Sequence, residues 1–337
     1  MHLLDILACP RCRADLVKQG AGLSCTGCGH AYPVEDGVPI LLPTDDPAQV
    51  VHEAELETRG GYVTIVQQVF DSLGPNAVIL DLGAGNRNVA DERIVRMDVL
   101  RSPHVDIVGD AHALPFKDDV ITFLHASAVW EHLRRPWIAS KEVGRILQPG
   151  GNAFVDCAFV YPFHGYPAVF FNASVEGLRT LFEGLVEVCA GVAPWHMPSF
   201  AIEGLLSQYH RFFKPDTEEG HRFVEILEQI DTLPLRDFDR CFELKDAERI
   251  AAVVFVYVRK AVADGEAGIL PVAVAAAWAG DPALQERYRD PQALAPDIDA
   301  AVVDNMFTWA RGEGRAADPA IAAWLDEVEP FTRRLSG

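Results

Sequence analysis

The sequence lacks the features that would place it in a membrane or give it a broad nucleic-acid-binding surface. No apolar run reaches the ~18–20 residues of a membrane-spanning helix, and the first ten residues carry Asp5 without the basic cluster of a secretory signal. Basic residues are scarce: 29 Lys and Arg stand against 49 Asp and Glu, a formal net charge of −20. Because contacts with phosphates need clustered Lys and Arg, we do not expect nucleic acid or a membrane as partners.

The chain also lacks the even number of cysteines that is typical of a secreted disulfide framework. It has seven cysteines, which favours a cytoplasmic protein with reduced thiols. Four of them form two C-x2-C pairs separated by twelve residues, at Cys9, Cys12, Cys25 and Cys28. Such pairs suit a tetrahedral zinc site, and four protein ligands make the Zn²⁺ structural rather than catalytic. Two disulfides are the alternative.

A glycine-rich turn follows a short apolar run in the segment NAVILDLGAGNRN. Residues 77–80 are typical of a strand buried on both faces of a parallel sheet. Asp81 ends the run, and Gly83 and Gly85 allow a tight turn and a close approach to a ligand. The third glycine of the dinucleotide fingerprint is missing, since Asn88 holds its place. A carboxylate at Asp81 would repel a pyrophosphate and would suit a cationic ligand.

Two further carboxylates follow predicted strands. Asp98 ends the run Arg93 to Asp98, where a carboxylate can accept hydrogen bonds from both ribose hydroxyls. Asp110 ends a third strand and opens the run GDAHALPF, and a fourth strand covers 120–125. A fifth begins after Gln148-Pro149-Gly150-Gly151.

These segments resemble class I S-adenosylmethionine-dependent methyltransferases in the order of four motifs, over roughly residues 76–190. Residues 1–43 resemble the small zinc-ribbon proteins that activate tRNA and protein methyltransferases. The resemblance implies an α/β fold, a doubly wound seven-stranded Rossmann-like sheet with S-adenosyl-L-methionine at its strand ends. Carried over residue by residue, the cofactor-binding positions are Asp81, Gly83, Ala84, Gly85, Asp98, Val99, Asp110 and Ala111.

The substrate side is expected after the fourth and fifth strands, where an α/β sheet opens. His164 lies in the aromatic run YPFHGYP and is a candidate general base. The pair Glu131-His132 either fixes a loop or includes a second catalytic group, His132. The substrate-binding candidates are Trp130, Tyr161, His164 and Tyr166.

We therefore divide the chain into four parts. They are a zinc ribbon (1–43), a connector with an approach helix (44–75), a methyltransferase domain (76–262) with a helical insertion at about 195–245, and a helical C-terminal extension (263–337). The extension has aromatic anchors and no recognisable chemistry, so docking on a second subunit as a homodimer is a guess.

The favoured hypothesis is methyl transfer to a small-molecule biosynthetic acceptor, such as a sugar or natural product. An RNA-modifying methyltransferase that uses the ribbon for recognition remains open, as does a non-catalytic scaffold. A nicotinamide dehydrogenase is disfavoured by Asp81 and by the missing third glycine.

Overall fold

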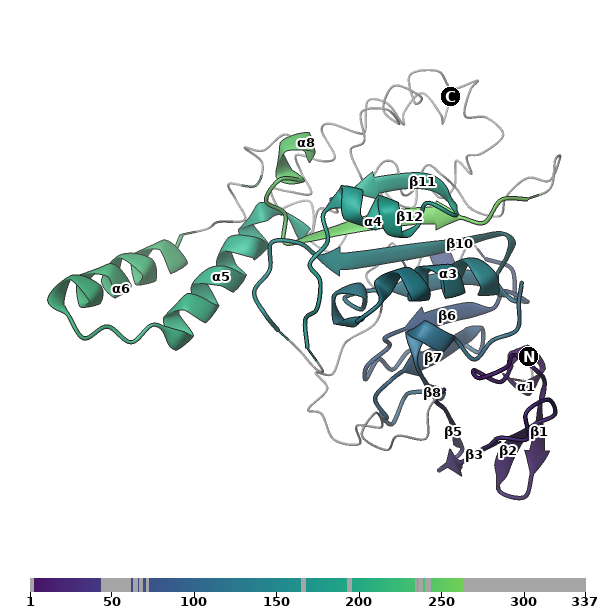
Figure 1. Ribbon diagram of the computed structural model, residues 1–337. Helices are drawn as coiled ribbons and strands as arrows, with labels where there is room; N and C mark the ends of the chain where they lie inside the picture. The colour runs from purple at the N-terminus through teal and green to yellow at the C-terminus, as the bar shows by residue number, and fades with distance from the viewer. Residues whose placement is uncertain are drawn as a thin grey trace, which may run out of the picture. The chain divides into compact units, whose positions relative to one another are not determined.

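The computed structural model describes residues 3–43, 62, 66, 69–70, 73–164, 168–192, 196–233, 235, 239 and 244–262 (Figure 1). The expected connector at 44–61 and the C-terminal extension at 263–337 lie outside these residues. Within the described part of the chain, no helix is both long and apolar enough to cross a membrane. The chain forms two compact units. The first contains Met1–Asp156, Arg179–Val188 and Tyr257–Leu270, and the second contains Cys157–Leu178, Cys189–Val256 and Pro271–Gly337.

The N-terminal part of the first unit is a small ribbon. After α1 (Leu3–Ile6), the strands β1 (Leu16–Gln19), β2 (Gly22–Cys25) and β3 (Ala31–Tyr32) form an antiparallel sheet. Only one or two residues in each strand are buried. So small a core gains little from apolar burial, and a segment of this size is expected to need a metal or another cross-link.

A hairpin leads from the ribbon into the larger sheet. β4 (Val34–Glu35) and β5 (Val38–Leu41) pair antiparallel across the turn Asp36-Gly37, where φ is 48° and 85°. Positive φ at both turn positions matches the twist of a hairpin, and Asp-Gly is a typical residue pair for such a turn. β5 then pairs parallel with β8, with Ile40 opposite Val108 and Leu41 opposite Gly109. The ribbon is therefore joined to the larger sheet by backbone hydrogen bonds.

The larger sheet has nine strands in the order β11-β12-β10-β9-β6-β7-β8-β5-β4. Strands β6 to β12 are the seven predicted strands, and the hairpin adds β4 and β5 at one edge. Neighbouring pairs from β10 to β8 are parallel. Backbone bonds join Gly150 with Lys260 in the first unit and Phe159 with Ala252 in the second, so β12 runs antiparallel to β10. The strands are β6 (Ile79–Leu82), β7 (Ile94–Asp98), β8 (Ile107–Gly109), β9 (Ile121–Ala126), β10 (Leu147–Ala158), β11 (Val186–Gly191) and β12 (Val253–Arg259).

The central strands are covered on both faces. All four residues of β6 and all six of β9 are buried, as the continuous apolar runs predict. Phe70 and Phe123 are fully buried, with ring centroids 5.7 Å apart. Burying a side chain of this size contributes about 1.5–3 kcal/mol. Short helices connect these strands: η2 (Ala111–Ala113), η3 (Trp130–His132), α3 (Pro136–Ile146) and α4 (Val175–Leu181).

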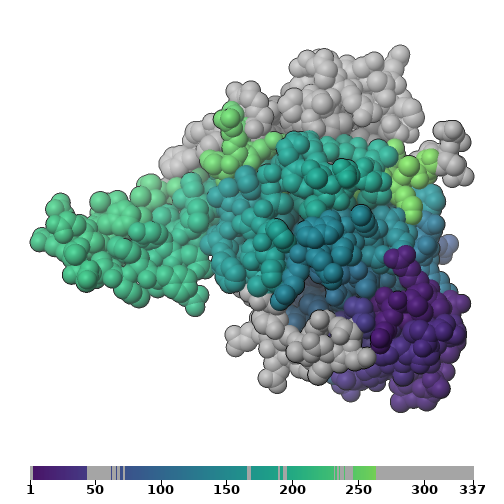
Figure 2. Space-filling view, viewed as in Figure 1, coloured from purple at the N-terminus to yellow at the C-terminus, as the bar shows by residue number. Residues whose placement is uncertain are grey.

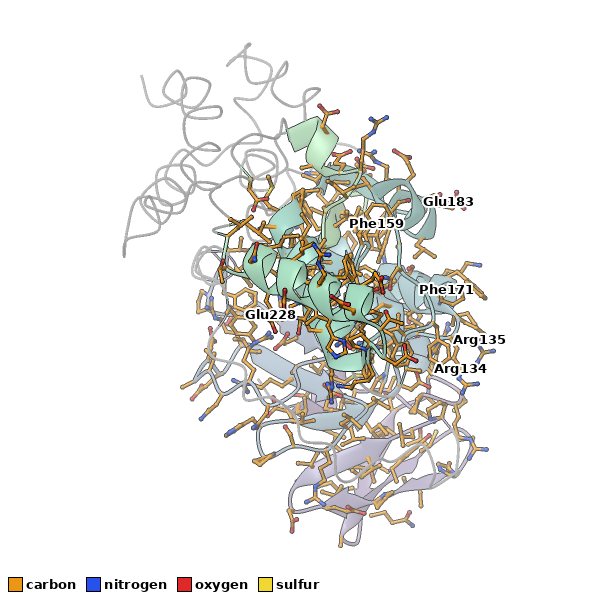
Figure 3. The ribbon with its side chains drawn as sticks, turned by 90° about the vertical axis from the view of Figure 1, so that its left-hand side faces the viewer. Arg134, Arg135, Phe159, Phe171, Glu183 and Glu228 are labelled. Atoms are coloured by element: carbon orange, nitrogen blue, oxygen red, sulfur yellow. The ribbon has the colours of Figure 1, made fainter. Side chains whose placement is uncertain are left out.

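The second unit contains the predicted helical insertion. It forms α5 (Pro198–Phe212), α6 (Glu218–Asp231) and α8 (Leu244–Ala247). Thr217 caps α6 by accepting a hydrogen bond from the Gly220 N–H. Tyr209, Phe213 and Phe223 hold α5 and α6 together, with ring centroids 5.1–6.0 Å apart. In Figure 3, Phe171 of the same unit points outward, and it is 44% exposed.

A second contact in the first unit ties the ribbon to the segment after β8. The Ala8 N–H donates to the Pro115 carbonyl, and the Lys117 N–H donates to the Ile6 carbonyl. The space-filling view shows the purple ribbon lying directly against the blue residues of this unit (Figure 2). The segment Asp110 to Phe116 is therefore held at both ends. β8, which precedes it, pairs with β5, and the end of the segment pairs with residues 6–8 of the ribbon.

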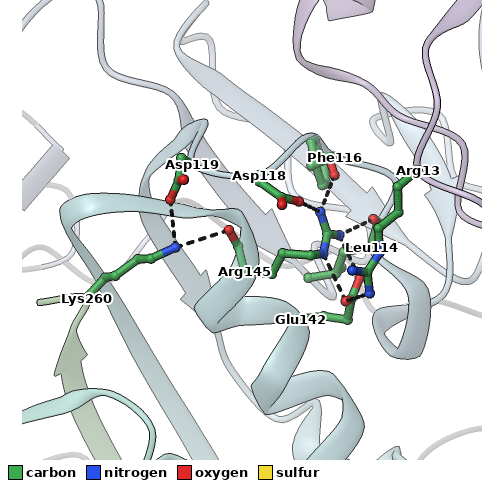
Figure 4. Close-up of polar contacts among 8 residues, drawn as sticks. All are labelled: Arg13, Leu114, Phe116, Asp118, Asp119, Glu142, Arg145 and Lys260. Atoms are coloured by element: carbon green, nitrogen blue, oxygen red, sulfur yellow. Dashed lines mark hydrogen bonds and ion pairs between the residues drawn. The ribbon is translucent and has the colours of Figure 1, made fainter.

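Arg145 reinforces this contact from α3 (Figure 4). Its guanidinium donates to the carbonyls of Leu114 and Phe116 at 2.9 and 2.7 Å, and to Glu142 at 2.6 Å. Glu142 in turn accepts from Arg13 of the ribbon at 2.9 Å. The side chains of Arg145 and Glu142 are only 10% and 9% exposed, whereas that of Arg13 is 60% exposed.

We expect Arg145→Met to lower the free energy of unfolding by about 2–4 kcal/mol, because it leaves two carbonyls and the Glu142 carboxylate without their donor in a buried place. The matched variant Arg13→Met removes an exposed partner of the same carboxylate and should cost less than about 1 kcal/mol. Urea unfolding of both variants measures the difference. Equal reductions in the free energy of unfolding for the two variants would show that the Arg145 cluster does not stabilise the unit.

Candidate functional site

The four predicted cysteines come together in the ribbon. The sulfurs of Cys9, Cys12, Cys25 and Cys28 all lie within 4.8 Å of one another. Cys9 Sγ is 3.8 Å from Cys28 Sγ, and Cys12 Sγ is 3.3 Å from Cys25 Sγ. With Zn–S bonds of about 2.3 Å, the edges of a tetrahedron measure about 3.8 Å, so the four sulfurs fit a zinc ion. The thiols are free, and their spacings exceed the ~2.05 Å of a disulfide.

The surroundings of Cys25 favour a thiolate at that position. The N–H groups of Gly27 and Cys28 donate to Cys25 Sγ at 3.3 and 3.4 Å. Desolvation raises the pKa of Cys25, but the backbone donor of Cys28 and its neighbours outweigh it and lower that pKa to about 6. The Tyr32 hydroxyl lies 3.0 Å from Cys9 Sγ. Desolvation and this sulfur raise the pKa of Tyr32, so its O–H is the donor. These contacts orient the ligands that a metal would take.

The glycine turn bends over the end of β7. Gly83 and Gly85 have φ of 72° and 59°, the left-handed region that glycine adopts without strain. The N–H groups of Gly83 and Ala84 donate to the Met97 carbonyl, and the Gly85 N–H donates to Asp98 Oδ2 at 2.8 Å. Asp98 Oδ1 accepts from the Leu100 N–H at 2.9 Å. Both carboxylate oxygens of Asp98 are thus oriented by backbone N–H groups.

Asp81 lies beneath the turn and is fully buried. Its Oδ2 accepts from Arg87 Nη1 at 2.6 Å and from the Tyr62 hydroxyl at 2.8 Å, and its Oδ1 lies 2.9 Å from His125 Nδ1. Burial raises the pKa of Asp81, but His125 and Arg87 outweigh it and hold that pKa below its ordinary value. The sequence predicted that Asp81 would suit a cationic ligand. In the structure Asp81 already has a counterion from the protein, Arg87.

Asp110 caps η2 after β8. Its Oδ1 accepts from the backbone N–H of His112 at 2.8 Å and lies 2.6 Å from His112 Nδ1. Desolvation raises the pKa of Asp110, and these contacts with His112 more than offset it, so the net change is downward. His112 Nε2 then accepts from the Arg135 N–H at 3.2 Å. Asp110 is therefore an oriented anion. Arg134 and Arg135 themselves point outward (Figure 3).

The loop after β9 packs on the glycine turn. A Cβ at Gly83 would lie 2.2 Å from Val129 Cγ2, so only glycine fits beneath that side chain. Ala128 has a φ of 55°, which is costly for a residue with a Cβ. Its N–H donates to Asp156 Oδ1 at 2.8 Å. Asp156, at the end of β10, thus helps to hold the loop that leads to η3.

The predicted substrate and catalytic residues are placed as follows. Trp130 is 1% exposed, and its Nε1–H donates to Ser140, so it packs in the core of the first unit. His132 ends η3 in that unit. Tyr161 and His164 belong to the second unit, with ring centroids 5.1 Å apart. Tyr166 lies outside the described residues.

Sequence reasoning did not identify Arg87, His125 or Ser102 as parts of this site. Ser102 donates to the Gly85 carbonyl at 2.7 Å and so holds the turn from the loop after β7. A cavity of about 490 Å³ is lined by residues 88–92, 96 and 103–106. None of the predicted cofactor residues lines it.

Comparison with known families agrees with this arrangement. Residues 2–37 match the model of the Trm112p-like proteins, and residues 60–155 match a methyltransferase domain. The first match covers the ribbon and the second covers the glycine turn and all three carboxylates. The protein is an S-adenosylmethionine-dependent methyltransferase with a Trm112-like N-terminal domain.

Two curated relatives of the Trm112-like domain match it over most of their own length. A UPF0434 protein of Vesicomyosocius okutanii is 52% identical over 40 residues, which are 12% of this chain and 68% of the relative. One of Alcanivorax borkumensis is 44% identical over 55 residues, which are 16% of this chain and 89% of the relative. In the methyltransferase, these residues are one part of a much longer chain.

Two solved structures illustrate the similarity of the larger part. A complex of the Haloferax volcanii Trm112 methyltransferase activator with a methyltransferase is 14% identical, with a TM-score of 0.33, over 58% of this chain and 86% of that chain. A phosphoethanolamine N-methyltransferase of Haemonchus contortus is 12% identical, with a TM-score of 0.33, over 58% of this chain and 52% of that chain.

We expect the purified methyltransferase to contain about one Zn²⁺ per chain, because four thiolates fill a structural site. Atomic absorption measures the metal, and Co²⁺ exchange should give the visible spectrum of a tetrahedral thiolate site. Cys25→Ser should lower the metal content. The matched control Cys157→Ser, which changes a buried cysteine outside the cluster, should leave it unchanged. Metal-free protein with intact cysteines would contradict the assignment.

Asp81→Asn should destabilise the methyltransferase by about 3–5 kcal/mol at neutral pH, because it leaves the buried Arg87 without its counterion. The folded-state pKa of Asp81 lies below its unfolded value, so this stability is present above the unfolded pKa and is lost as the pH falls. The difference in the free energy of unfolding between wild type and variant should therefore decrease below about pH 4. Asp15→Asn, at an exposed pair with Lys117, is the control and should change little. A difference that is independent of pH would contradict the prediction.

Proposed function

We propose that the methyltransferase binds S-adenosyl-L-methionine at the carboxyl ends of β6, β7 and β8 and methylates a small molecule. The observation that carries the proposal is the position of the three acids. Asp81, Asp98 and Asp110 lie at or just after the ends of three adjacent parallel strands, beside a turn that only glycine can form. When bound, the cofactor supplies a sulfonium methyl group for in-line displacement.

The adenosine end of the cofactor is assigned to Asp98, Val99, Asp110 and Ala111. Asp98 is held by two backbone N–H groups, which orient a carboxylate that would accept from the ribose hydroxyls. Asp110 is charged and oriented by His112, which suits the adenine amino group. Gly83, Ala84 and Gly85 form the turn that lets the backbone approach the cofactor. The pairing of residues 38–41 and 6–8 around the Asp110 segment supports a role for the ribbon in holding this part of the site.

His164 is the proposed general base of the second unit. Its Nδ1 lies 2.9 Å from the Pro162 carbonyl oxygen, which can only accept. Nδ1 therefore carries the proton, and Nε2 of the neutral ring would accept one from an acceptor hydroxyl or amine. His132 is proposed as a second catalytic candidate from the first unit. Alignment of the acceptor with the methyl group and exclusion of water would supply most of the remaining rate enhancement.

Exposed aromatic side chains favour a flat or apolar acceptor. Tyr161, Phe163, Phe170 and Phe171 follow β10 in the second unit and are 36–70% exposed. Aromatic faces of this kind suit a sugar ring or an aromatic natural product. Tyr161 and Tyr166 are therefore kept as substrate-binding proposals, whereas the buried Trp130 would position the loop after β9.

The basic residues near the ribbon do not favour RNA. Arg13 pairs with Glu142, Lys117 with Asp15, and Arg101 with Glu35. Charges paired in this way offer little to phosphates. We propose instead that the ribbon serves the methyltransferase domain of its own chain through β5. A homodimer formed through residues 263–337 stays a prediction.

The proposal is tested by following a labelled methyl group. The full-length protein is incubated with methyl-labelled S-adenosylmethionine and a cell extract, and the products are separated by size before and after nuclease or protease treatment. We expect the label in the low-mass fraction without digestion. Asp98→Ala should abolish the transfer, and Asp106→Asn, at a partly exposed pair with Arg96, should not. Label in nuclease-sensitive material would overturn the small-molecule assignment in favour of RNA.

A further inference from the structure

The second unit contains a two-helix hairpin, residues 198–233, formed by α5, α6 and the turn between them (Figure 1). Of the α6 residues whose burial the structure describes, only Leu227 is buried. Most of the stability of a helix in a protein comes from packing its apolar face, so a helix this exposed lacks part of its packing. Seven large apolar residues of the hairpin are 39–69% exposed, namely Ile202, Leu205, Tyr209, Phe212, Phe223, Ile226 and Leu233. A cluster of this size marks an interaction surface.

The exposed side chains lie at the same spacing in both helices. They are residues 202, 205, 209 and 212 in α5, and residues 223, 226 and 233 in and just after α6, where the partly buried Ile230 fills the remaining place. Steps of three, four and three residues place side chains along one narrow stripe of a helix. We call these eight residues the apolar stripe. Such a spacing is typical of the seam along which helices pair with other helices.

The rest of the second unit covers other sides of α5. Tyr209 and Phe213 pack on Phe223, with ring centroids 5.7 and 6.0 Å apart, and hold α6 alongside. On a different side, a Cβ at Gly204 would lie 2.9 Å from the Tyr161 ring. With about 3.6 residues per turn, the apolar stripe of α5 lies between these two sides. The stripe is therefore an apolar side of α5 that this unit leaves exposed.

The area of the apolar stripe fits a pair of identical surfaces. A large side chain offers roughly 150–250 Å² when it is fully exposed. The seven exposed members therefore offer roughly 500–800 Å² per copy. Two copies together would bury roughly 1,000–1,600 Å², which overlaps the ~1,200–2,000 Å² of stable, specific interfaces.

We propose that the apolar stripe is a dimer interface and that its occupant is the same stripe of a second copy of the chain. A two-fold axis brings identical patches together, so a surface that is complementary to itself needs no other partner. Two hairpins then form a four-helix bundle, whose core consists of side chains at this spacing. The bundle buries the apolar side chains that one hairpin leaves in water.

The charges of α6 favour a helical partner over a membrane. The helix has five acidic residues and one arginine, whereas helices that lie on membranes carry Lys and Arg beside their apolar face. Glu225 and Glu228 lie on the side of α6 opposite the apolar stripe, where a second copy does not approach them. Gln208 and Gln229 flank the stripe at equivalent positions of the two helices, and neither carries a charge that would repel its copy.

Analytical ultracentrifugation of the full-length protein tests the proposal. We expect wild type to sediment with twice the 37.0 kDa mass of one chain and to dissociate on dilution. Phe212→Ser and Ile226→Ser each remove one apolar side chain per copy and should raise the dissociation constant of the dimer roughly tenfold or more. The matched control is Phe163→Ser in the segment after β10. Phe163 is 70% exposed against 69% for Phe212, and this variant should keep the dimer.

A second measurement covers a variant that fails to fold, which circular dichroism would detect. In wild type, the backbone amides of residues 202–212 and 223–230 should exchange hydrogen more slowly at concentrations where the dimer forms than after dilution. A wild-type monomer at every concentration overturns the proposal and leaves residues 263–337 or a different protein as the occupant of the stripe. A dimer that persists unchanged in both stripe variants places the interface elsewhere and overturns it as well. Neither result depends on methyl transfer, so the proposed function is tested separately.

Discussion

The geometry of the site depends on neutralising one buried negative charge, the Asp81 carboxylate. Asp81 is the last residue but one of β6, in the middle of the sheet, where an unpaired carboxylate would cost several kcal/mol. Arg87, Tyr62 and His125 reach it from three different segments. Each contact also fixes the partner: Arg87 holds the far end of the glycine turn, Tyr62 ties in the segment before β6, and His125 links β6 to β9. The same carboxylate therefore organises the turn and the strands on which a cofactor would lie.

The attachment of the ribbon extends this arrangement to the other side of the site. β8 would otherwise be an edge strand, and β5 covers that edge with parallel backbone pairing. Residues 6–8 and Arg145 hold the segment that follows β8. The Asp110 segment is thus fixed at both ends by groups that lie on or pack against the ribbon.

Much of this could be predicted from local sequence patterns. The buried strands, the Asp-Gly hairpin, the two cysteine pairs and the strand-end acids each depend on neighbouring residues, and the seven-stranded order followed from a family resemblance. The partners of Asp81 could not be predicted in this way. His125 is 44 residues away and lies opposite Asp81 only because β9 pairs with β6. The addition of β4 and β5 to the sheet was missed for the same reason, since nothing within residues 34–41 specifies β8 as a partner.

The missed residues also explain why Asp81 was interpreted too simply. Reading the carboxylate as a free counter-charge for a cationic ligand ignores the cost of keeping it unpaired before the ligand arrives. A protein that must fold without its cofactor needs an internal cation, and Arg87 supplies it from six residues along the chain.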